Sequence, residues 1–311
     1  MKRTAVVAGC VVVVVAVGAA IWFWFGDAKH GMASTAEVNA GGGVAGSAMP
    51  VARLTPRQPS GRPGSSAYDP AMLQQVGAKA YSIHRPPPWR TAGDAKQQVL
   101  ALKPRSDAGD GLATYEIELV VRDCRNLISG EPEASWQAMR RAGMRPDPDF
   151  LSKLEVRLGE CVALSQDPAL YRAPWLARAA EQGSVEAQLL YGIDVRTAVG
   201  AASAEELAER EEDVLAWRET SLRYLHALAD GGNVEALSGL QSVHEHGYRT
   251  VKDPVAAYAY GQVLQRLSPT FWSDALLAES RQALSLDQQR MAAEQAEAIY
   301  RRCCMLPGPS D

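Results

Sequence analysis

The longest apolar run of the chain lies close to its start. Residues 5–25 carry no charged side chain and follow Lys2 and Arg3. A helix of this length spans about 30 Å, close to the thickness of a bilayer core. The run ends in four aromatic residues, 22–25, which favour the membrane–water interface. The pattern predicts a transmembrane helix at 1–25, with a cytoplasmic start and the rest of the chain outside the cytoplasm.

Two alternatives remain open for this segment. A cleaved signal peptide would use the small residues around Ala28, although its apolar stretch is usually shorter and does not end in bulky aromatic residues. A lipoprotein would use Cys10, but most of the apolar run would then follow the modified cysteine. Cleavage of a signal peptide would release the protein into the periplasm, whereas an uncleaved transmembrane helix would hold it at the inner membrane.

Residues 26–88 are rich in Gly, Ala, Ser and Pro, including the triplet at 41–43 and the prolines at 86–88. Such a segment cannot bury enough apolar surface to offset the entropy lost on ordering. We therefore expect a flexible linker, ending in a stiff extended stretch at the three prolines.

Helical periodicity dominates after Trp89. In the region 89–168 we expect a helix with apolar positions from Leu112 to Ile128, a short helix at 133–142, and a third helix after Asp149. If consecutive helices run up, down and up, the first and third are parallel. Cys124 and Cys161 would then lie at one level, which predicts a disulfide in an exported domain.

A sequence repeat marks the region 169–268. The letters WLARAAEQGSVEA, beginning at Trp175, return as YLHALADGGNVEA, beginning at Tyr224. In each copy a helix is expected to end at a glycine, Gly183 or Gly232, whose missing Cβ tolerates a left-handed conformation. Ser184 or Asn233 would then cap the next helix. Such self-similarity is typical of stacked helical repeats.

These residues resemble the Sel1-like repeat family, whose α/α repeats are related to tetratricopeptide repeats. The resemblance covers about one third of the chain and implies an all-α solenoid with a helical cap on each side, at 89–168 and 269–311. The spacing of the two copies is longer than usual, because an acidic helix is expected at 205–213. The motif residues are expected to be structural: Trp175, Ala180, Gly183, Ala187, Gly192, Tyr224, Ala229, Gly232, Ala236, Gly247 and Asp253.

No catalytic, cofactor or metal motif is recognisable. His244 and His246 are two residues apart and point to opposite sides of a helix, unlike a zinc-binding pair. The acidic residues of 205–213 are expected on a solvated face or a docking edge. Three options remain open for Cys303 and Cys304: one is buried and the other free, the two bond to each other after the helix ends, or a thiol links two chains. The net charge of −4 argues against nucleic-acid binding.

The sequence therefore favours a non-enzymatic scaffold that binds protein partners in the periplasm. One version, suggested by the family resemblance, is an immunity protein against a toxin that acts there. The alternatives are a structural assembly factor of a secretion or pilus apparatus and an envelope hydrolase, for which no nucleophile–base arrangement is visible.

Overall fold

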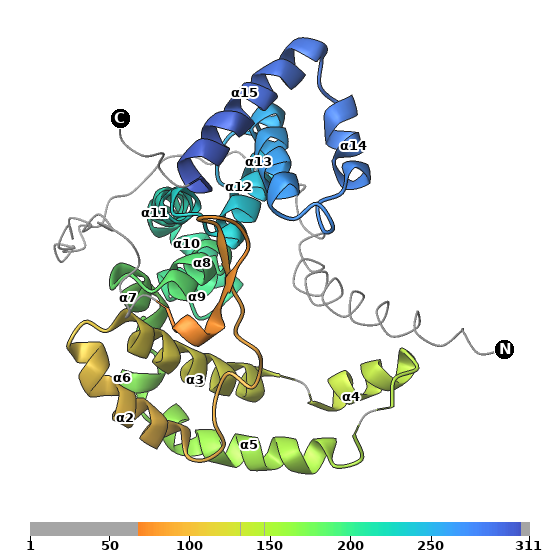
Figure 1. Ribbon diagram of the computed structural model, residues 1–311. Coiled ribbons are helices and arrows are strands. Elements are labelled where there is room, and N and C mark those ends of the chain that lie inside the picture. Colours follow the sequence, from red (N-terminus) through yellow and green to blue (C-terminus); the bar gives the residue numbers. More distant parts are fainter. Residues whose placement is uncertain (1–67, 131, 146, 306–311) are drawn as a thin grey trace, which may run out of the picture. The chain divides into compact units, whose positions relative to one another are not determined.

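A computed structural model describes residues 68–130, 132–145 and 147–305, which all belong to one compact unit of the chain (Figure 1). Helices dominate it, which confirms the prediction of a mostly helical protein. The helices are α2 (Ala95–Asp107), α3 (Gly111–Ser129), α4 (Pro132–Arg141), α5 (Phe150–Ser165), α6 (Pro168–Tyr171), α7 (Trp175–Glu181), α8 (Val185–Ile193), α9 (Val195–Val199), α10 (Ala204–Glu209), α11 (Glu211–Asp230), α12 (Val234–His246), α13 (Pro254–Leu267), α14 (Asp274–Gln282) and α15 (Leu286–Cys303).

The expected anchor at 1–25 and most of the expected linker lie outside the described residues. Within the part of the chain that is described, no helix has both the length and the apolar character needed to cross a bilayer.

The linker ends earlier than its predicted boundary at residue 88. A short 3₁₀ helix, η1 (Pro70–Met72), leads into an antiparallel hairpin of β1 (Leu73–Gln75) and β2 (Tyr81–Ile83). The N–H of Tyr81 donates to the carbonyl of Gly232 at 2.9 Å, so the hairpin docks on the turn between α11 and α12. Ala80 and Tyr81 are buried there. Lys79 Nζ also donates to the carbonyls of Asp230 and Arg302, so apolar and polar contacts together hold this part of the Gly- and Pro-rich stretch on the helices.

The two sequence copies fold into helix pairs with the same local structure. Gly183, between α7 and α8, and Gly232, between α11 and α12, adopt φ values of +90° and +92°. The side chains of Ser184 and Asn233 accept from the backbone N–H groups three residues later, at 3.3 and 2.8 Å. Both pairs thus satisfy their exposed N–H groups in the same way.

The segment between the two pairs is broken where one acidic helix was expected. Ser203 caps α10, which ends at Glu209, and α11 begins at Glu211, after the single residue Arg210. Arg210 has φ −107° and ψ 49°, outside the helical region, and its guanidinium contacts both Glu206 and Asp213. The expected helix at 205–213 therefore divides into two, with the arginine at the corner.

The helices α2, α3 and α5 enclose the first of three apolar clusters, which contains the bonded pair Cys124 and Cys161 with a Cα–Cα distance of 5.5 Å. The up-down-up bundle from which this pair was predicted is wrong. In Figure 1, α3 and α5 run in opposite directions, and none of the α4 side chains that the structure describes, from residue 133 on, is buried. The two cysteines meet because α5 packs directly against α3, without α4 between them.

The other two clusters continue the same stacking along the chain. One is formed mainly by α3, α7, α8 and α11, and the other by α11 to α15 together with the hairpin. In the C-terminal part, α15 packs on α13 through Ala292, Ala296 and Ile299, while Leu286 and Met291 on its other positions are exposed. The helices thus extend from α2, α3 and α5 at one end, through α7, α8 and α11, to α12, α13 and α15 at the other (Figure 1).

Candidate functional site

The motif residues of the two copies build the core and the turns. Trp175, Ala180, Ala187, Ala229 and Ala236 are buried. Asp253 caps α13 by accepting from the N–H groups of residues 255 and 256, and Gly247 ends α12 at φ +73°. Tyr224 packs edge-on against Tyr191, and Gly192 is enclosed beside Leu225. These residues therefore lie in the core, at helix caps and in turns.

The terminal cysteines lie at the end of α15. Cys303 and Cys304 are bonded to each other, and both are buried in the C-terminal cluster. Of the options left open by the sequence, the structure has the one in which the two cysteines bond to each other where the helix ends.

The histidines and acidic residues singled out by the sequence are dispersed. The His244 ring stacks on Tyr260 at 5.8 Å, whereas His246 Nδ1 lies 2.9 Å from the carbonyl of Ser242. Across the described residues, no group of three His, Cys, Asp or Glu side chains is placed to hold a metal ion. Burial lowers the pKa of His244, and its Nδ1 is enclosed without a hydrogen-bond partner.

A site that the sequence analysis missed centres on Arg249, in the loop that follows α12. This residue is only 9% exposed, and its guanidinium carbon lies 5.2 Å from the centre of the Trp217 ring and 5.0 Å from that of Tyr248. Its Nη1 reaches toward Gly192 of α8, where a Cβ would be 3.6 Å away. The small motif residue therefore leaves room for the arginine side chain.

Arg249 has no carboxylate partner among the described residues. Its Nε is fully enclosed and makes no hydrogen bond. Burial lowers the pKa of its guanidinium, and Tyr248 opposes this only in part. By contrast, the well-buried Arg90 is paired with both Asp123 and Glu160 at 2.8 Å. A charge removed from water without a counter-charge is costly, so Arg249 is an exception to the way this protein treats its buried arginines.

An open hollow of about 460 Å³ adjoins the arginine, because Trp217 and Tyr248 contribute to its lining as well. Aliphatic side chains from α9, α10 and α11 form most of the rest, and Glu211 and Arg218 are its charged residues. Leu215 and Tyr248 are 52% and 43% exposed, and the adjoining segments carry exposed Ile193 and Val251. The site thus combines solvent-facing apolar surface with an unpaired cation.

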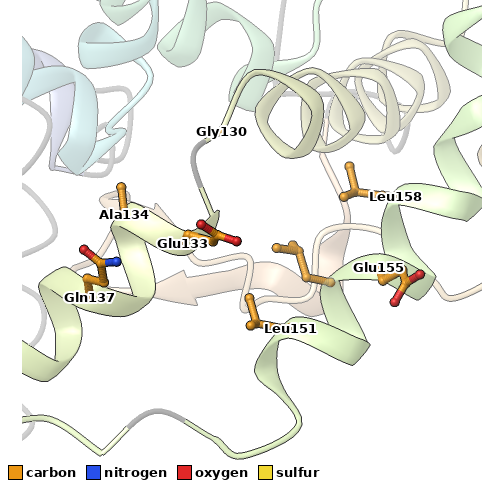
Figure 2. Close-up of a pocket in the computed structure, with 8 residues that line it drawn as sticks. Gly130, Glu133, Ala134, Gln137, Leu151, Glu155 and Leu158 are labelled. Carbon is orange, nitrogen blue, oxygen red and sulfur yellow. The ribbon is translucent and has the colours of Figure 1, made fainter.

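A second, larger opening of about 760 Å³ lies between α4 and α5. Figure 2 shows Ala134 and Gln137 of α4 on one side and Leu151 and Leu158 of α5 on the other. Two glutamates, Glu133 and Glu155, are its charged residues, and neither forms an ion pair within the described chain. This opening follows from α4 standing away from the core, and it contains no enclosed polar group that would select a ligand.

The signal for the Arg249 site is not visible in a linear pattern. Trp217 lies 32 positions before the arginine along the chain, between the acidic helix expected at 205–213 and the second copy of the repeat, and no role was expected of it. Comparison with known proteins adds no relative: no family model, no curated protein and no solved structure matches this chain.

Proposed function

We propose that this chain is a non-enzymatic scaffold of the bacterial cell envelope that binds a protein partner through the hollow beside Arg249. The apolar run at 5–25 would hold it at the inner membrane, with the helical region in the periplasm. The two helix pairs would be Sel1-like repeats, a fold that offers extended surfaces for protein binding.

The observation that carries this proposal is the exposed apolar surface around the hollow. Single exposed apolar side chains are common on monomers, but apolar side chains grouped in one exposed patch often mark a site where a partner binds. Here Leu215, Tyr248 and the aliphatic lining of the hollow face solvent together. Aromatic residues and arginine are also the residue types most often found at the energetic centre of protein interfaces.

Photo-crosslinking in the source organism tests the proposal. A photoreactive amino acid replaces Leu215 in the full-length chain, and the matched control carries it at Leu286, which is 79% exposed on α15. We expect one discrete adduct from position 215 and none from position 286. Equal adducts from both positions, or none from position 215, would refute binding at this surface.

The mass-spectrometric identity of the adduct separates the partner classes. A periplasm-acting toxin would support an immunity role, and a component of a secretion or pilus apparatus would support an assembly role. A cytoplasmic protein as the sole partner would contradict the proposed location.

A further inference from the structure

We propose that Arg249 binds the carboxylate of an acidic side chain on the partner, while a neighbouring apolar side chain of the same segment fills the adjoining hollow. This inference rests on the proposed function and specifies the chemistry of the partner. The ligand is therefore a protein segment in which Asp or Glu lies next to a large apolar residue.

The state of the guanidinium supplies the first argument. Trp217 and Tyr248 contribute cation–π attraction, but neither ring provides a counter-charge. Its Nε is enclosed without an acceptor, and no described carboxylate pairs with its terminal nitrogens. A partner carboxylate at the 9% of this residue that stays exposed would pair with the planar donor group in the manner that arginine favours.

The matched arrangement elsewhere in the chain supports this interpretation. Arg85 is half-buried, and its guanidinium also lies against an aromatic ring, 5.9 Å from the centre of Tyr115. Its guanidinium, however, donates to both carboxylate oxygens of Glu186, at 2.7 and 2.8 Å. Arg249 reproduces the aromatic part of this arrangement without the glutamate. The missing component is a carboxylate, which a partner would provide.

The hollow favours a carboxylate on a protein segment over a free phosphate. Its lining is mostly aliphatic and aromatic, and its volume of about 460 Å³ has room for a large side chain. A phosphate dianion usually recruits several cationic or N–H donors, whereas Arg218 is the one cation among the residues that line the hollow, and Arg249 lies beside it. One guanidinium beside an apolar hollow matches one carboxylate beside an apolar side chain.

Peptides selected from a random display library on the full-length chain in detergent micelles provide the probe. They are synthesised with acetylated N-termini and amidated C-termini, and binding is measured by fluorescence anisotropy. We expect the selected peptides to share an acidic residue next to Leu, Ile, Phe or Trp. Replacing that Asp or Glu by its amide should weaken binding to the wild-type chain at least tenfold.

Two arginine variants complete a double-mutant cycle. Arg249→Met keeps an apolar side chain of similar length, and Arg249→Lys keeps the charge but loses the planar donor edge. Both variants should bind the acidic peptide at least tenfold more weakly than the wild type. For Arg249→Met, replacing the acid of the peptide by its amide should then cause no further loss of binding. The lysine variant keeps the test valid if the methionine variant does not fold.

Three outcomes would overturn the proposal. The acid-to-amide change could weaken both chains equally, or the selected peptides could lack acidic residues, or binding could require a free C-terminal carboxylate. A different result would refute the proposed function. An adduct at Leu215 that forms equally well in the wild type and in Arg249→Met would support the scaffold but refute carboxylate recognition, whereas no adduct in either would refute the scaffold.

Discussion

Arg122 on α3 lies between Glu118 of its own helix and Asp194 at the end of α8. Its Nε is 3.3 Å from Glu118 Oε1, and its Nη2 is 2.9 Å from Asp194 Oδ2. Glu118 is fully buried, and burial raises the pKa of its carboxyl group while Arg122 opposes the rise. The arginine therefore joins the N-terminal helices to the first helix pair through a buried set of charges.

Removing the Arg122 side chain should strongly destabilise the folded protein. Arg122→Ala leaves the buried Glu118 with only the more distant Arg125, 3.9 Å away. We expect a loss of about 3–5 kcal/mol in the free energy of unfolding, because one partner of a buried pair is removed. Urea denaturation measures this loss of stability.

The control for this variant is Arg218→Ala, which removes an exposed arginine that forms no ion pair within the described residues. It should change the free energy of unfolding by less than about 0.5 kcal/mol. Equal effects of the two substitutions would show that the buried charges do not couple α3 to α8.

The two turn glycines give a matched pair of substitutions. Gly183→Ala and Gly232→Ala both place a Cβ at a left-handed φ, which costs each about 1 kcal/mol. A Cβ at Gly183 meets no atom within 4 Å, whereas one at Gly232 lies 2.8 Å from the carbonyl oxygens of Lys79 and Cys303. Gly232→Ala should therefore cost a further 1–3 kcal/mol, roughly the range for overpacking.

Thermal denaturation of the two glycine variants checks this difference. If Gly183→Ala were as damaging as Gly232→Ala, the docking of the hairpin and of α15 around Gly232 would not constrain that turn.

The stability of the protein should depend on the protonation of His244. Burial lowers the pKa of its ring in the folded state below the ordinary value of 6.5, so the unfolded chain binds the proton more readily. The stability that the neutral His244 ring contributes to the folded state is fully present above pH 6.5. It is lost as the pH falls through the lower folded-state pKa. The wild type should therefore lose stability relative to His244→Phe between pH 7.5 and 5.

Guanidinium denaturation at several pH values gives this difference directly. His246→Phe, which changes an exposed ring, serves as the control and should follow the wild type. A constant difference between the wild type and His244→Phe across the range would contradict the assignment.

The disulfide between Cys124 and Cys161 should matter more than the one at the end of α15. It closes a loop with a sequence separation of 37, for which the chain-entropy account predicts a contribution of about 3–4 kcal/mol. Cys303 and Cys304 are adjacent, so their bond restricts the unfolded chain very little. Cys124→Ala/Cys161→Ala should lower the urea midpoint well below that of Cys303→Ala/Cys304→Ala. The opposite order would refute the entropic argument.

Several features of this fold follow from local sequence. Ser184, Asn233 and Asp253 cap helices because short polar side chains satisfy free N–H groups, and Gly183 and Gly232 end helices because they lack a Cβ. These preferences act over a few residues, so they can be predicted from the sequence alone. The predominance of helices and the repetition of the helix pair were predicted on this basis.

Other features required the tertiary structure. Tyr81 orders a stretch assigned to the linker because it meets the turn at Gly232, and α5 runs against α3 in a direction that helix succession did not predict. Arg249 is unusual only because folding places it between Trp217 and Tyr248 without a carboxylate. The sequence by itself determined the helices and their caps, which depend on near neighbours. Only the fold decided which distant groups meet and which charge is left without a partner, because burial and pairing depend on contacts between residues far apart in the chain.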